Sequence, residues 1–149
     1  MSDLRSYISQ IKKINELKTI KSSVSTKYEI AGITAKVDGS DAVLFEKIKE
    51  SDFRLIANLV GTRKRFAIAV GGTENNIHEK VISAIKKAKK SKIISSGKFM
   101  ENKSKNLLSM PIVSHFEKES GPFITSSVAY AKNPETGKQN SSFHRMMPI

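Results

Sequence analysis

The sequence has 149 residues, which fits one compact domain or one domain with an appendage. It contains no cysteine, and this excludes a disulfide framework, a thiolate nucleophile and a cysteine-based zinc site. Its apolar stretches fall far short of the ~20 residues that span a bilayer, and the first residues lack the apolar region of a secretory signal. We therefore expect a cytoplasmic protein without membrane insertion.

Hydrophobic periodicity and turn residues predict alternating helices and strands in the first two thirds of the chain. Helices are expected over 4–17, with Ser2 or Asp3 as N-cap, and over 28–37, with Gly39 as the stop. Short strands follow at 42–45 and 54–60. Thr62 caps a helix that runs through Ala69 and ends at Gly71 and Gly72. A longer helix opens at Thr73 and frays over 89–92, and its expected buried stripe is Ile77, Val81, Ile85 and Ala88.

The remaining third differs in composition: a polar connector is followed by a single β-hairpin. Strands are expected over 123–131 and 139–146, and the turn chemistry lies over 133–137. The fold class is α/β, with an amino-terminal domain over 1–105 and a connector with its hairpin over 106–149. A lone hairpin is marginal in water and its last strand would present an open edge. We expect another subunit, a copy of the chain or a remainder of the gene product to complete this sheet.

The polar run from Asn140 to Arg145 is the candidate binding site. Asn140, Ser141, Ser142, His144 and Arg145 bring an amide, two hydroxyls, an imidazole and a guanidinium into six residues around one phenylalanine. Such groups hold a phosphate or a metal-bridged phosphate. In a regular strand, however, Asn140 and Arg145 point to opposite faces. Joint contact with one cofactor would require a bulge, strong twist or the two ends of an extended ligand.

The net charge of +12 is concentrated in the first 105 residues and is thickest from Lys80 to Lys105. A basic face of this kind can attract nucleic acid or acidic membrane. The segment has Phe99 as its only aromatic residue, so it lacks the interleaved rings on which bases stack. A solvated lysine-rich face is the simpler interpretation. The histidines show no metal-binding spacing.

The order of motifs resembles the amino-terminal portion of the UbiD-type, prenylated-FMN-dependent decarboxylases, the 3-octaprenyl-4-hydroxybenzoate carboxy-lyase related family. The likeness covers nearly the whole chain. The strings that carry it are Tyr28-Glu29-Ile30-Ala31, Ala42-Val43-Leu44-Phe45-Glu46, Ala57-Asn58-Leu59-Val60-Gly61-Thr62-Arg63, Pro111-Ile112 with His115, Gly121-Pro122-Phe123-Ile124-Thr125, Asn133-Pro134-Glu135-Thr136-Gly137, and Asn140 with Arg145.

This resemblance implies a hairpin that begins a split flavin-binding β-barrel, and a role for each residue of the polar run. Asn140 would help bind a divalent metal, typically Mn²⁺, that bridges to the phosphate of prenylated FMN (or FMN), with K⁺ nearby. Arg145 would be the catalytic residue beside the isoalloxazine and the substrate carboxylate. Ser141, Ser142, Phe143 and His144 would line the cofactor, partly through main-chain atoms. The reaction would be non-oxidative decarboxylation of an unsaturated or aromatic acid.

The family is several hundred residues long, and its other metal ligands, its catalytic glutamates and most of its barrel would lie downstream. Three hypotheses follow. The first is an amino-terminal subunit or fragment of a decarboxylase that needs a partner chain for activity. The second is a catalytically inactive α/β interaction module or homo-oligomer. The third is a basic nucleic-acid-binding protein, which the missing aromatics disfavour.

Overall fold

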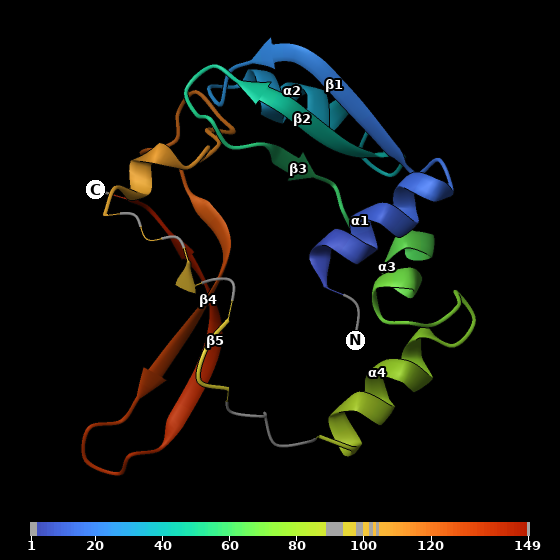
Figure 1. The fold of residues 1–149 in the computed structure, drawn as a ribbon, viewed down its shortest axis with the longest axis vertical. Helices are drawn as coiled ribbons and strands as arrows, with labels where there is room; N and C mark the ends of the chain where they lie inside the picture. The colour runs from blue at the N-terminus through green and yellow to red at the C-terminus, as the bar shows by residue number, and fades with distance from the viewer. Residues whose placement is uncertain (1–2, 89–93, 98–99, 102, 104, 149) are drawn as a thin grey trace.

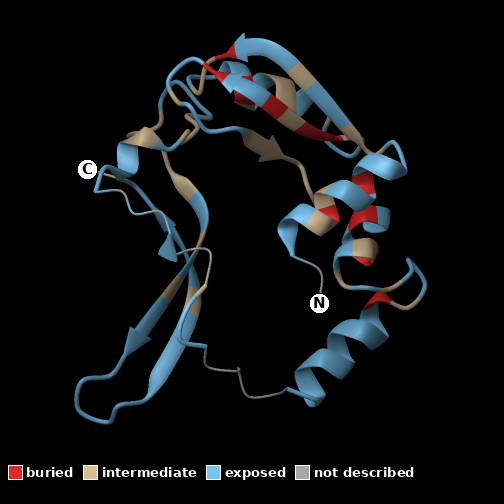
Figure 2. Cartoon of the chain, viewed as in Figure 1, coloured by how far each residue is buried: buried red, intermediate tan, exposed pale blue. Residues whose placement is uncertain are grey.

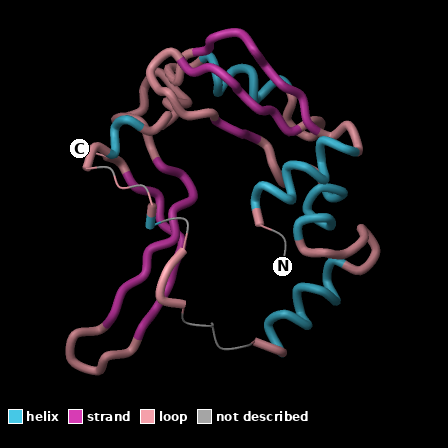
Figure 3. Tube along the Cα trace, in the orientation of Figure 1, coloured by secondary structure: helices cyan, strands magenta, loops and turns pink. Residues whose placement is uncertain are grey.

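The computed structural model describes residues 3–88, 94–97, 100–101, 103 and 105–148. Figure 1 shows an α/β body from which a long hairpin projects, joined to it at one end. The elements in chain order are α1 (Leu4–Lys13), β1 (Leu17–Val24), α2 (Glu29–Lys36), β2 (Ala42–Ile48), β3 (Leu55–Ala57), α3 (Arg63–Ala69), α4 (Ile77–Lys86), the 3₁₀ turn η2 (Leu107–Ser109), β4 (Ile124–Lys132) and β5 (Gln139–Met146). The predicted α/β class is confirmed, with two small sheets (Figure 3).

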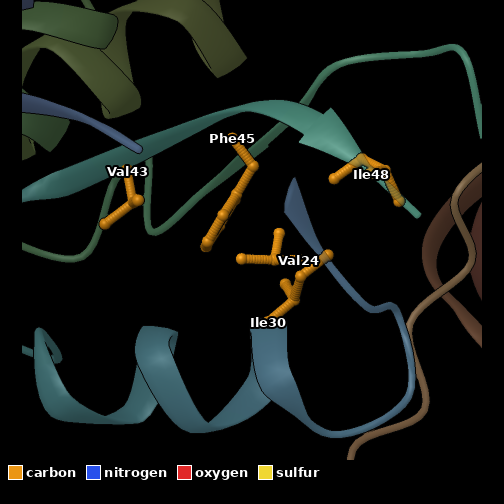
Figure 4. Packing of buried hydrophobic residues seen from close by; sticks show 5 residues of the cluster. All are labelled: Val24, Ile30, Val43, Phe45 and Ile48. Atoms are coloured by element: carbon orange, nitrogen blue, oxygen red, sulfur yellow. The ribbon is translucent and has the colours of Figure 1, made fainter. Parts of the chain in front are cut away.

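The body is built on a β–α–β unit. Strands β1 and β2 run parallel, from the pair Leu17 and Ala42 to the pair Val24 and Ile48, and α2 forms the crossover between them. β3 pairs antiparallel with β2 and forms the edge of this three-stranded sheet. Figure 4 shows side chains of β2 directed at α2, where they pack with the end of β1. The core cluster is Val24, Ile30, Val43, Phe45 and Ile48.

A second cluster joins α1 to the sheet and to α3 through Tyr7, Ile11 and Ala42. Beside it, the side chain of Arg65 is completely buried. Its guanidinium donates to the carboxylate of Glu16 at 2.9 Å, to the carbonyls of Leu59 and Asn58 at 3.2 Å each, and to the carbonyl of Ser40. Because each of its three nitrogens donates to at least one acceptor, this cation fixes α3 against the segments that precede β1 and β2 and follow β3.

The first helix ends earlier than predicted. α1 stops at Lys13, and Asn15 adopts a left-handed backbone with φ of 58°. Asparagine tolerates this conformation and commonly ends helices. Leu17, predicted to close the helix, instead opens β1, a strand that the periodicity did not predict. Asp3 is the N-cap, as one of the two predicted alternatives, and accepts from the amide of Ser6 at 2.7 Å.

Local sequence signals predict the bounds of α2 and α3 correctly. The range 28–37 and the stop at Gly39, with φ of 70°, are confirmed. The hydroxyl of Thr62 accepts from the amide of Arg65 at 3.2 Å, so the predicted cap of α3 is confirmed too. The strand predicted over 54–60 is shorter, because Asn58 turns the chain with φ of 56° after β3. β2 continues past the predicted 42–45 because its last residues pair with β1.

The predicted stripe of α4 is wrong. Of its four residues only Ile77 is buried, whereas Val81, Ile85 and Ala88 are exposed. The helix begins at Ile77 rather than at Thr73, because residues 74–76 form a turn. Figure 2 shows α4 almost wholly exposed, since no other element of the described chain packs along it. The predicted fraying over 89–92 and Phe99 lie outside the described residues.

The hairpin is attached to the body through the segment that precedes it. Ser114 forms an isolated parallel bridge with Lys27, and the Ser51 hydroxyl donates to the Ser109 carbonyl at 2.7 Å. Val113 packs against the core cluster of β2 and α2. Beyond this attachment β4 and β5 pair with each other and with no further strand among the described residues, so these strands form an open hairpin and not a closed barrel. The predicted division at residue 105 stays a prediction.

The helices within the described part of the chain are all too short or too polar to cross a membrane.

Candidate functional site

The register of the hairpin sorts the polar run onto two faces. β5 occupies 139–146, as predicted, and pairs residue for residue with β4 from Gln139 opposite Lys132 to His144 opposite Ser127. Side chains alternate along a strand, so one face carries Asn140, Ser142 and His144. The opposite face carries Ser141, Phe143 and Arg145. The structure therefore does not bring all six predicted residues onto one surface.

The face of Asn140, Ser142 and His144 is flat and polar. The residues opposite them on β4 are the small Ala131, Ala129 and Ser127. The Ser142 hydroxyl lies 2.8 Å from Nε2 of His144, and the Ser127 hydroxyl donates to the His144 carbonyl at 2.7 Å. Small neighbours leave the amide, hydroxyl and imidazole uncovered along the strand, so an elongated ligand can lie across them.

Asn140 lies at the tip end of this face. It borders a hollow of about 480 Å³ together with Lys132 at the end of β4 and with Thr136 and Lys138 from the loop that joins the two strands. Gly137, with φ of 68°, and the side chain of Asn133 close this turn, which the sequence predicted over 133–137. The two lysines make no ion pair within the described residues. Sequence reasoning missed them, although they offer positive charge to an anion near Asn140.

Arg145 lies at the other end of β5, where the pairing is irregular. Between the pairs Ile124–Met146 and Ser127–His144, two residues of β4, Thr125 and Ser126, oppose Arg145 alone. Such a bulge bends the strand and increases its twist. A bulge was one of the three conditions for Asn140 and Arg145 to serve one cofactor, and it is present on the partner strand. The two residues are separated by about 17 Å along the strand.

The guanidinium carbon of Arg145 lies 4.6 Å from the centroid of the Phe123 ring. The nearby carboxylate of Glu119 accepts from the amides of His115 at 2.7 Å and Phe116 at 3.0 Å. These hydrogen bonds, the one from Phe116 foremost, lower the pKa of Glu119, and the positive charges of His115 and Arg145 lower it further. Sequence reasoning named neither Phe123 nor Glu119 as part of the site.

A cavity of about 600 Å³ lies between the base of the hairpin and the body. Its lining is mostly apolar and includes Phe123 beside the bulge residues Thr125 and Ser126. His115 lines it as well, and its amide is held by Glu119. The cavity therefore borders the Arg145 end of the site, whereas Asn140 lies at the far end of the hairpin.

The donor set fits a metal only in part. A divalent cation takes about six oxygen ligands, and Asn140 offers one amide oxygen. No three side chains among histidine, aspartate and glutamate gather into a possible metal site in the described ranges. A metal bound at Asn140 would need most of its ligands from groups outside these residues.

Comparisons with known proteins cover the body and the hairpin. The family model described as the 3-octaprenyl-4-hydroxybenzoate carboxy-lyase N-terminal domain matches residues 8–85. The model of the carboxy-lyase Rift-related domain matches residues 86–149. The chain is 29% identical over 146 residues to the anhydromevalonate phosphate decarboxylase of Methanothermobacter thermautotrophicus, which covers 98% of this chain and 34% of that protein. The corresponding enzyme of Methanosarcina mazei is 28% identical over 147 residues, covering 97% of this chain and 33% of the relative.

Solved structures of UbiD-class enzymes are similar to this chain as well. An evolved dimeric form of the UbiD-class enzyme HmfF from Pelotomaculum thermopropionicum, in complex with prFMN, has a TM-score of 0.88 and 27% identity, covering 97% of this chain and 35% of that one. HmfF in complex with FMN has a TM-score of 0.86 and 28% identity, covering 95% and 33%. The chain thus spans about a third of the length of the relatives it matches. With its body and its hairpin both matched, the chain belongs to the UbiD family of 3-octaprenyl-4-hydroxybenzoate carboxy-lyases.

Proposed function

We propose that these 149 residues form the amino-terminal portion of a UbiD-type non-oxidative decarboxylase and supply one wall of its prenylated-FMN site. The observation that carries this proposal is the pairing of a family match over 8–149 with the polar run on β5, where Asn140 and Arg145 stand at opposite ends. Two relatives are named decarboxylases, and one solved neighbour holds prFMN. The acid substrate would be unsaturated or aromatic.

The two ends of β5 suit the two ends of a flavin mononucleotide. At the tip, the Asn140 amide oxygen and the cations of Lys132 and Lys138 suit a phosphate and a cation that neutralises it, Mn²⁺ with K⁺ nearby. At the base, the Arg145 guanidinium would lie beside the isoalloxazine, where it suits the carboxylate of the acid substrate, which it can hold by two parallel hydrogen bonds. Between them Ser142 and His144 would line the cofactor by side chains, and Ser141 and Phe143 by main-chain atoms. The bound prenylated flavin would supply the electron sink.

This wall needs groups from elsewhere, on a partner polypeptide, on a further part of the enzyme or on a second copy of the chain. Tyr130 and Phe143, which lie on the face opposite Asn140, are 72% and 81% exposed, and Val128 beside them is exposed too. Aromatic rings exposed side by side on a sheet mark a surface that another part of a protein covers. The outer edges of β4 and β5 are open as well, and further strands can pair with them.

The proposal is tested on protein purified from its native host through a tag on this chain, so that any completing polypeptide is retained. In that assembly Arg145→Gln should lower decarboxylation about 10- to 100-fold, because a charge-assisted hydrogen bond contributes roughly 1.5–3 kcal/mol. Asn140→Ala should lower the content of bound metal and flavin, measured by elemental analysis and absorbance.

Glu135→Gln is the matched control, since this exposed residue lies in the turn of the same hairpin but does not line the hollow beside Asn140. It should leave flavin content and activity near those of the unmodified assembly. An assembly without flavin, or one in which Asn140→Ala and Arg145→Gln retain full flavin content and activity, would exclude this function. An inactive interaction module would then be the better description.

A further inference from the structure

Three features converge on the Arg145 side chain although none belongs to the polar run of β5. The first is the Phe123 ring, whose centroid lies 4.6 Å from the guanidinium carbon. A cation over an aromatic face at this distance is attracted by the ring quadrupole. Phe123 is half-buried and also lines the cavity at the base of the hairpin, so its ring is a fixed support rather than a free side chain.

The second feature is the bulge. Thr125 and Ser126 oppose Arg145 without a one-to-one partner, so β4 bends at this point and Phe123, just before the bulge, comes to lie beside Arg145. Without the extra residue, the pairing between Ser127 and His144 would continue in register to the end of β5. The bulge thus changes the direction of β4 so that the residues at its start lie beside Arg145.

The third feature is the loop over 115–121. Glu119 is held by the two amides of His115 and Phe116, so its negative charge has a fixed position near Arg145. Gly121 packs against the residue that follows β5: a Cβ atom at this glycine would come within 3.1 Å of the Met147 sulfur. The loop is therefore in contact with the chain two residues beyond Arg145, where the Ser120 hydroxyl also lies 3.8 Å from the Met147 sulfur.

We propose that Phe123 is a positioning residue that holds the Arg145 guanidinium at the base of the hairpin before any ligand binds. An exposed arginine side chain samples many rotamers, and it loses this conformational entropy when it binds a ligand. The Phe123 ring, 4.6 Å from the guanidinium carbon, reduces this loss, and the Coulombic attraction of the fixed Glu119 carboxylate acts in the same direction. The role in ligand binding rests on the proposed function, whereas the restraint on Arg145 is a property of the chain itself.

The restraint is tested by NMR spectroscopy on the 149-residue chain, with the Arg145 side-chain signals assigned by their loss in Arg145→Lys. Stacking on Phe123 should move the Arg145 δ-proton signals upfield from those of an unrestrained arginine. Phe123→Leu should abolish this shift, and Phe123→Tyr should preserve it. Phe116→Leu is the matched control, because Phe116 is 73% exposed in the same loop. An Arg145 signal that is unshifted, or unchanged in Phe123→Leu, overturns the proposal.

The consequence for ligand binding is measured with FMN as the probe, on assemblies purified from the native host. Phe123→Leu should weaken FMN binding about 2- to 5-fold, the loss expected for one exposed cation–π contact, and Phe123→Tyr should restore it. If the assembly binds no FMN while the NMR shift behaves as described, the proposed function fails and the restraint stands. If FMN binds equally well to Phe123→Leu and to the unmodified assembly, the positioning role is wrong while the proposed function stands.

Discussion

Replacing Arg65 by methionine should lower the free energy of unfolding by about 3–5 kcal/mol, the usual cost of removing one partner from a buried ion pair. Methionine fills most of the volume, so the loss comes from the acceptors left behind. These are the Glu16 carboxylate and the carbonyls of Leu59, Asn58 and Ser40. Urea unfolding followed by far-ultraviolet circular dichroism measures the change, since the chain has no tryptophan for fluorescence.

Lys64→Met is the matched control for Arg65. Lys64 also binds Glu16, at 2.7 Å, but half of its side chain is exposed, whereas that of Arg65 is buried. Its hydrogen bond is the main reason that the pKa of Glu16 lies below the ordinary value of a glutamate. An exposed pair of this kind contributes about 0–1 kcal/mol. Equal effects of the two substitutions would show that burial does not determine the strength of this network.

Phe45→Ala should cost about 3–5 kcal/mol, as is typical when a buried aromatic side chain is removed from a core. Phe45 lies on the central strand β2 and is completely buried between that strand and α2, in contact with the core residues of β1 and α2 (Figure 4). Closing the resulting cavity would require α2 to move closer to the sheet, against the other side chains packed between them. Urea unfolding is again the measurement.

Phe53→Ala removes the same side chain from a position that is 54% exposed. Its effect should stay within about 0.5 kcal/mol, the usual range for surface substitutions. A loss of stability in Phe45→Ala no greater than in Phe53→Ala would mean that the β–α–β unit is not the core of this chain.

The parts of the fold that the sequence predicts well depend on local signals. Thr62 caps α3 through its own side chain, and Gly39 ends the α2 region because it adopts a positive φ. β5 begins and ends where predicted, since the turn over 133–137 fixes its start. In each of these cases the deciding interaction lies within a few residues of the element.

The parts of the fold that the sequence pattern does not predict depend on partners that are distant in the sequence. β1 alternates poorly and is mostly exposed, and its pairing with β2 lies 24 to 25 residues away in the sequence. Asn15 was a signal for the end of α1, because asparagine tolerates a left-handed backbone. Periodicity predicts a buried apolar stripe on α4, yet periodicity reports amphipathicity and not whether a partner is present. Val81 and Ile85 are exposed in the structure.

In the candidate site, too, local sequence predicts some features, whereas others depend on residues that are distant in the sequence. Side-chain alternation alone predicts that Asn140 and Arg145 lie on opposite faces, and the register of β5 confirms a regular strand from Gln139 to His144. The bulge opposite Arg145 lies on the other strand, so no pattern within 139–146 reveals it. The contact between Arg145 and Phe123 likewise arises only when β4 and β5 are paired.

Titration of the purified 149-residue chain with FMN, followed by absorbance and by gel filtration, tests most directly whether this wall suffices alone. One charge-assisted contact contributes about 1.5–3 kcal/mol, whereas millimolar binding already needs about 4 kcal/mol. The separate chain should therefore not saturate below about 1 mM FMN, while the native-host assembly should elute yellow with flavin bound. Tight flavin binding by the chain as a monomer would contradict the claim that the site is shared.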